Sequence, residues 1–113
     1  MRTIISGSRT ITDAGLLYRV MERCPWEPTT ILSGGARGVD KLGEEWAREW
    51  GIPLEVYPAN WEKYGKTAGF IRNSQMASKA RALVAIKTGV SNGTKNMIKH
   101  AVEHGLHIYV FAV

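Results

Sequence analysis

A short segment of the chain combines three glycines with an arginine and an acid. It reads Ser33-Gly34-Gly35-Ala36-Arg37-Gly38-Val39-Asp40. Glycine has no side chain, so an anion can approach its backbone N–H groups closely. Arginine offers forked N–H groups to phosphate oxygens, and the carboxylate of Asp40 can accept hydrogen bonds from ribose hydroxyls. The segment predicts a site for an anionic ligand, and a nucleotide is the ligand we expect.

Residues of the same types recur in three other segments. Gly7-Ser8-Arg9 joins glycine to a hydroxyl and a basic residue, and Ser91-Asn92-Gly93-Thr94 joins it to hydroxyl and amide residues. The segment 58–69 carries aromatic residues and Lys66. A helix that begins at such a segment offers unpaired N–H groups and a partial positive charge. We therefore expect these residues to contact the ligand: Gly7, Ser8, Arg9, Gly34, Gly35, Arg37, Gly38, Asp40, Trp61, Lys66, Arg72, Ser91, Gly93 and Thr94.

Each of these residues also has a purely structural interpretation. A glycine after a strand often only makes a tight turn, and Asp40 can simply cap a helix or face its dipole. Trp61 and Tyr64 could stack on a base, or they could pack their loop onto the body of the protein. The prediction of a site rests on several such loops meeting at one edge, and not on any one of them alone.

Hydrophobic periodicity predicts alternating strands and helices. The expected strands are residues 3–6, 29–32, 54–57, 82–87 and 107–111, and the expected helices are residues 13–24, 39–50, 71–79 and 94–104. Thr12 is the expected N-cap of the first helix. In the second helix, Trp46 and Trp50 lie on the apolar stripe and Glu44 on the polar side. This order predicts one domain, residues 1–113, of the α/β class: a Rossmann-like parallel sheet with helices on both faces. Such sheets bind ligands at the carboxyl ends of their strands.

Composition restricts the class of protein further. The chain has 113 residues, no apolar run near the roughly 20 residues of a membrane span, and one cysteine. We therefore expect a cytoplasmic protein with no membrane contact. The net charge of +5 favours anionic partners, either a polynucleotide or a small phosphate compound.

Three short motifs in the chain are incomplete. Ser33 stands where a dinucleotide-binding fingerprint needs its first glycine, and Asn60 stands where a P-loop ending in Gly65-Lys66-Thr67 needs a glycine. His100 and His104 have metal-ligand spacing, but no third ligand is evident. We expect neither a metal nor a cofactor.

Taken together, these segments resemble the SLOG superfamily, which includes the DprA-like DNA-processing proteins and the LOG nucleotide hydrolases. The resemblance lies in residues 5–9, 33–40, 65–73 and 91–94, and it is nearest to the YspA-like branch of small bacterial and phage proteins. It implies a sheet in the order 3-2-1-4-5 with a nucleotide-type pocket where the strand order reverses. It also adds Asn73 to the candidate site, because Arg72 and Asn73 match an Arg-Asn pair of the DprA-like proteins.

The resemblance implies binding of a nucleotide-derived small molecule, such as ADP-ribose, an NAD derivative or a nucleoside phosphate, for sensing or sequestration. It also implies a homo-oligomer. Two alternatives stay open: single-stranded nucleic-acid binding of the DprA kind, and nucleotide N-glycosidase activity. The LOG hydrolases carry a catalytic glutamate at the position of Met97, and methionine can neither move a proton nor stabilise an oxocarbenium ion. We therefore favour a binding protein over an enzyme.

Overall fold

Five parallel strands form the centre of the molecule, and the computed structural model describes all residues, 1–113. The strands are β1 (Arg2–Gly7), β2 (Thr30–Ser33), β3 (Leu54–Val56), β4 (Ala82–Lys87) and β5 (His107–Ala112). They lie in the order β3-β2-β1-β4-β5, and every neighbouring pair is parallel. The predicted Rossmann-like sheet and its strand order are confirmed.

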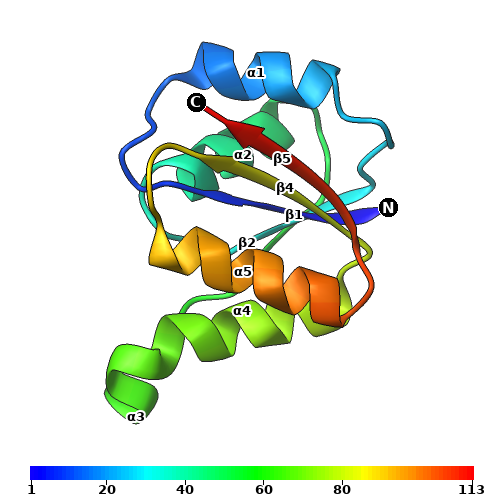
Figure 1. Cartoon of the computed structure of the whole chain (residues 1–113). Coiled ribbons are helices and arrows are strands. Elements are labelled where there is room, and N and C mark those ends of the chain that lie inside the picture. The colour runs from blue at the N-terminus through cyan, green and yellow to red at the C-terminus, as the bar shows by residue number, and fades with distance from the viewer.

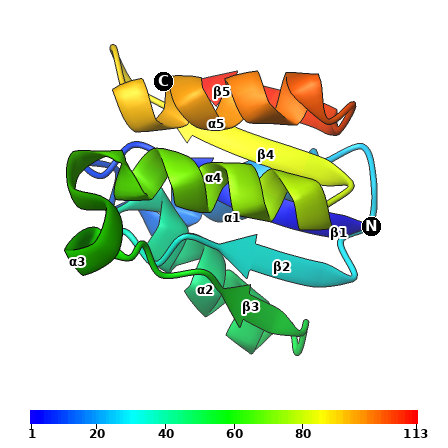
Figure 2. The same cartoon turned by 90° about the horizontal axis from the view of Figure 1, so that it is seen from below.

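Helices cover both faces of this sheet (Figure 1). The elements are α1 (Ala14–Glu22), α2 (Val39–Glu49), the short α3 (Trp61–Tyr64), a 3-10 turn η1 (Gly65–Thr67), α4 (Ala68–Lys79) and α5 (Asn92–Glu103). Figure 2 shows α4 and α5 side by side on one face, with α1 and α2 behind the sheet. In both views α3 projects from the body at the start of α4. No helix has both the length and the apolar content needed to cross a bilayer.

Two apolar clusters lie between these layers because successive strand residues point to opposite faces. Ile5, Ile31, Val84 and Ile86 pack against α1 and α2, whereas Ile4, Leu32 and Leu83 pack against α4 and α5. β1 and β4 are apolar on both faces, as expected of central parallel strands. The cores hold the carboxyl ends of these two strands, and the loops that follow them, in fixed positions.

Three details differ from the sequence prediction. Asp13, not Thr12, caps α1: its Oδ1 accepts N–H bonds from Gly15 at 2.9 Å and Leu16 at 3.3 Å. The fourth helix begins at Ala68, three residues before the expected start, and part of the expected loop forms α3. Trp50 is 66% exposed, because α2 ends there, and its ring lies beside that of Trp46.

Candidate functional site

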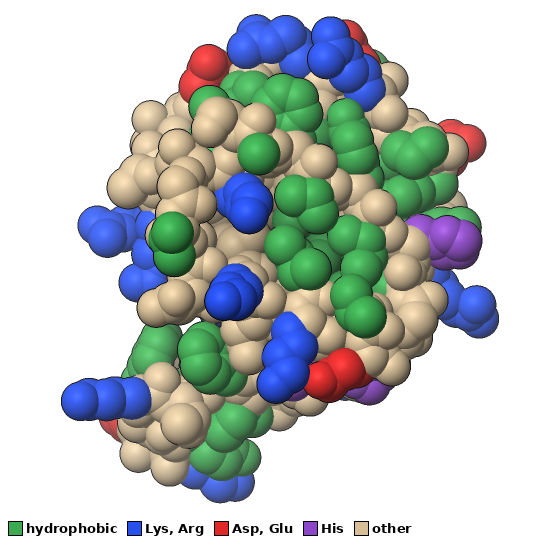
Figure 3. All heavy atoms as spheres, in the orientation of Figure 1, with side chains coloured by type: hydrophobic (Ala, Val, Ile, Leu, Met, Phe, Trp, Pro, Cys, Tyr) green, Lys and Arg blue, Asp and Glu red, His purple; other side chains and the backbone are tan.

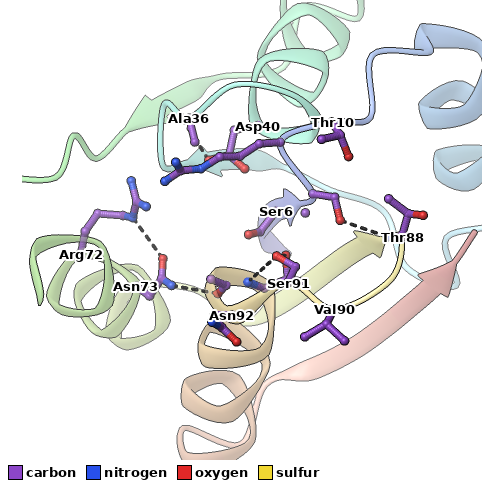
Figure 4. Close-up of a pocket in the computed structure, with 15 residues that line it drawn as sticks. Ser6, Thr10, Ala36, Asp40, Arg72, Asn73, Thr88, Val90, Ser91 and Asn92 are labelled. Atoms are coloured by element: carbon purple, nitrogen blue, oxygen red, sulfur yellow. Dashed lines mark hydrogen bonds between the residues drawn. The ribbon is translucent and has the colours of Figure 1, made fainter. Parts of the chain in front are cut away.

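A cavity of about 320 Å³ opens at the carboxyl ends of β1 and β4 (Figure 4). These two strands are neighbours in the sheet, but the chain reaches β4 only after building β2 and β3 on the other side of β1. The strand order therefore reverses at this cavity, which is where open α/β sheets bind their ligands. We call it the first cavity. Its walls are the loops after β1 and β4, the first turn of α5, and Asp40, Arg72 and Asn73.

A second cavity of about 630 Å³ lies beside the first. Its walls come from the loop after β2, the end of β3 and the segment that leads into α3, and they include Val56, Pro58, Ala59 and Trp61. Arg9, Ala36 and Arg72 line both cavities. The side chains of Arg9 and Arg72 thus stand at the boundary between the first cavity and the second, which has more apolar residues in its walls.

The structure brings most of the predicted residues to these two cavities. The first is lined by Gly7, Ser8, Arg9, Asp40, Arg72, Asn73, Ser91, Gly93 and Thr94, and the second by Arg9, Gly34, Gly35, Arg37, Trp61 and Arg72. Gly38 and Lys66 line neither. A Cβ on Gly38 would lie 2.3 Å from the Ser8 carbonyl oxygen, so this glycine lets two loops pack closely. Lys66 is exposed in η1.

Some lining residues were absent from the sequence prediction. The first cavity also includes Ser6, Thr10, Ala36, Thr88, Val90 and Asn92. All but Ser6, which was placed in the first strand, fall in or directly beside the loops expected at this edge. Thr10 follows Arg9, and Thr88 follows β4. Their position after a strand was a usable signal, but small neutral side chains in loops carry no chemical signature of their own.

Ser91 organises the first turn of α5 at the cavity. Its Oγ accepts the N–H of Thr94 at 3.3 Å and donates to the Thr94 hydroxyl at 2.9 Å. The N–H groups of Asn92 and Gly93, which line the cavity, make no hydrogen bond. Free N–H groups at a helix start attract anions. On the opposite wall, Ser8 Oγ accepts the N–H of Thr88 at 3.0 Å, which joins the loops after β1 and β4.

Arg72 and Asn73 connect three parts of the site. Arg72 Nε donates to Asn73 Oδ1 at 3.0 Å, and Nη1 donates to the carbonyl oxygen of Gly34. Asn73 Nδ2 donates to Asn96 Oδ1 at 3.1 Å and to the Gly93 carbonyl oxygen at 3.3 Å. The Nη2 group of Arg72 has no hydrogen-bond partner. Burial lowers the pKa of Arg72 from its ordinary value, against the attraction of Asp40.

Asp40 is the buried acid of the site, with 5% of its surface exposed. Its Oδ2 accepts the N–H of Ala36 at 3.2 Å. Burial raises the pKa of Asp40 to about 6, although the Ala36 N–H and the charge of Arg72 act in the opposite direction. A carboxylate held charged in this environment costs stability.

This burial predicts how the stability of an Asp40→Asn variant depends on pH. The folded wild type binds the Asp40 proton with a pKa of about 6, against 3.8 for the ordinary group. The free energy of unfolding of the wild type should therefore fall relative to the variant as pH rises from about 4 to 6. The relative change is about 3 kcal/mol, and it is complete at neutral pH. Urea unfolding of both proteins from pH 4 to pH 8 measures it, and a difference that stays constant over this range would contradict the burial argument.

Comparisons with known proteins identify the family. The model of the YspA, cpYpsA-related SLOG family matches residues 1–64. The chain is similar to the Gene 61 protein of Mycobacterium phage D29, with 31% identity over 97% of this chain and 95% of the phage protein. It also resembles the X-ray structure of DNA processing protein A (DprA) from Streptococcus pneumoniae.

The likeness to DprA concerns the fold, because the identity is 14% at a TM-score of 0.60. It covers 97% of this chain but only 58% of the DprA chain. The segments that resembled the SLOG superfamily in the sequence build the walls of the two cavities. With a family match over more than half of its length and a full-length phage relative, the chain belongs to the YspA, cpYpsA-related SLOG family.

Proposed function

We propose that the protein binds a nucleotide-derived small molecule, such as ADP-ribose, an NAD derivative or a nucleoside phosphate, and senses or sequesters it. The observation that carries this proposal is the first cavity, where free N–H groups of α5 and the side chains of Arg9 and Arg72 meet at the point of strand-order reversal. Membership of a SLOG family supports it.

The charges around the first cavity support an anionic ligand. Arg9 is exposed and has no acidic partner within ion-pair distance, and Arg72 is half-buried with one N–H group unpaired. Asp40 is the only acid that lines the cavity. A phosphate would complete the hydrogen bonds of the guanidinium groups and of the α5 N–H groups. Asp40, whose Oδ2 accepts the N–H of Ala36 at the boundary of the two cavities, would accept hydrogen bonds from ribose hydroxyls.

Hydrolysis of the LOG type has little support. Met97, at the position of the LOG catalytic glutamate, is fully buried in the cluster beneath α5 and does not line the cavity. Asp40 remains a titratable group at the site. Incubation with NAD, ADP-ribose and nucleoside monophosphates, followed by chromatography, should return them unchanged. Release of a free base would instead indicate the N-glycosidase alternative.

A panel of nucleotides in a thermal-unfolding assay tests the proposal. A ligand that binds only the folded protein, at 100 times its dissociation constant, adds about 2.7 kcal/mol to the free energy of unfolding. For a domain of this size we expect an increase in Tm of roughly 10 °C. No shift with any nucleotide or nucleotide sugar at millimolar concentration would contradict the proposal.

Single-stranded nucleic-acid binding is the second candidate. The exposed rings of Trp61 and Phe70, with the exposed Lys63 and Lys66 nearby in the chain, favour it. Figure 3 shows Lys and Arg side chains scattered over the face drawn, without a continuous basic stripe. Binding through several phosphates should weaken steeply with salt, so titration of a labelled oligonucleotide at 50 and 200 mM salt separates the two candidates.

A further inference from the structure

The second cavity differs in chemistry from the first, although the two are neighbours. Its walls contain the exposed ring of Trp61, the half-exposed side chain of Val56, and Pro58 and Ala59. A flat, largely apolar group would find an aromatic face and aliphatic contacts there, beside the cationic side chains of Arg37 and Lys41, which also line this cavity. Nucleobases stack on exposed aromatic rings in this way.

The two cavities share two arginine side chains, which can bind phosphate from either side. Arg9 and Arg72 line both, and Nη2 of Arg72 is free because its other two N–H-bearing nitrogens are engaged. The charge of Arg9 contributes to lowering the pKa of Arg72, against the attraction of Asp40, so two cations stand near each other at this boundary with one buried acid beside them. An anion that passes from one cavity to the other would meet both.

We infer, on the basis of the proposed function, that the ligand spans both cavities and is a nucleoside diphosphate or an ester of one, not a nucleoside monophosphate. The base lies in the second cavity on Trp61. The phosphate chain passes Arg9 and Arg72 into the first cavity and ends at the free N–H groups of Asn92 and Gly93. A single phosphate would accept hydrogen bonds either from the two arginines at the boundary or from the free N–H groups at the start of α5. A chain of two phosphates would accept them from both.

Calorimetric titration with pyrophosphate, AMP, ADP and ADP-ribose tests this assignment in the wild-type protein. ADP and ADP-ribose should each bind at least about tenfold more tightly than AMP, which lacks the second phosphate. They should also bind at least about tenfold more tightly than pyrophosphate, which lacks the base. Equal affinities for AMP and ADP, or for pyrophosphate and ADP, would overturn the inference.

A pair of tryptophan variants assigns the base to the second cavity. Trp61→Ala should remove most of the advantage of ADP over pyrophosphate and leave pyrophosphate affinity unchanged. Trp50→Ala is the matched control, because Trp50 is 66% exposed and lines neither cavity, and it should change neither affinity. Trp61→Phe keeps an aromatic ring and should retain most of the advantage.

The possible failures are distinguishable. If pyrophosphate and ADP both bind the wild type but Trp61→Ala weakens neither, or weakens both equally, the two-cavity inference is wrong and the proposed anion site stands. If none of the four compounds binds, the two-cavity inference is wrong, and the nucleotide panel in the thermal-unfolding assay decides whether the proposed function stands. If AMP binds as tightly as ADP-ribose, the site takes a monophosphate and the first cavity is sufficient.

Discussion

Replacing Arg72 with glutamine is expected to lower the affinity for ADP by about 100-fold or more. The side chain stands at the boundary of the two cavities and is half-buried. Its Nη2 group makes no hydrogen bond within the protein. Hydrogen bonds between a partly buried guanidinium and a phosphate are strong because both groups are charged and shielded from water. Loss of one charged partner in such a setting costs roughly 2–5 kcal/mol, and a 100-fold loss of affinity corresponds to about 2.7 kcal/mol. Calorimetric titration measures the effect.

Arg81→Gln is the matched control for this variant. Arg81 is exposed and directly precedes β4, at the amino end of the strands, so the net charge changes equally while the site stays intact. We expect its affinity to stay within about twofold of the wild type. Equal losses of affinity in both variants would mean that Arg72 acts only through the overall charge.

Because Arg72→Gln leaves the Asp40 charge uncompensated, the Asp40→Asn, Arg72→Gln double variant should recover stability but not affinity.

Replacing Gly38 with alanine is expected to lower the free energy of unfolding strongly. Gly38 has φ of 75°, a conformation that an L side chain rarely adopts. Its Cβ would lie 2.3 Å from the Ser8 carbonyl oxygen and 2.6 Å from the backbone of Arg9. These are backbone atoms of the loop after β1, which cannot rotate away as a side chain would. We expect a loss of about 3 kcal/mol or more in the free energy of unfolding, measured by urea denaturation.

Gly93→Ala provides the contrast. Gly93 lies in the first turn of α5, has an ordinary φ, and a Cβ there would meet nothing within 4 Å. Alanine is a better helix former than glycine, so we expect stability to stay the same or to rise slightly. If Gly38→Ala were as well tolerated as Gly93→Ala, the close packing of the loops after β1 and β2 would not be important for the fold.

Much of the fold could be predicted because the local pattern and the tertiary structure agree. The run Ala82–Lys87 is apolar in nearly every position, as a central strand buried on both faces must be, and its bounds match β4. The strand order was not contained in the periodicity; it came from the resemblance of the four segments to a known superfamily. α3 was missed because four residues followed by Gly65 are too few to show a helical period.

The sequence could predict at which edge of the sheet the candidate site lies and which loops form it. It could not predict which side chains line each cavity. Loops after strands must meet at one edge, which placed Arg9 and Ser91 near each other despite their separation in sequence. Which residues share a cavity depends on side-chain directions that sequence does not supply. Glu44 illustrates the limit: it was expected on the polar side of α2 but is 3% exposed, because Ser33 Oγ from β2 donates to its Oε2 at 2.7 Å.

The most direct test of the anion site is a backbone N–H chemical-shift titration of the ¹⁵N-labelled protein with pyrophosphate. If a phosphate enters the first cavity, the largest shifts will come from the loop after β1 and from residues 88–94, including Asn92 and Gly93. The N–H chemical shifts of the loops at the opposite edge, around residues 24–29 and 105–106, should stay unchanged. Shifts spread over all basic surfaces, or confined to the opposite edge, would contradict an anion-binding site between β1 and β4.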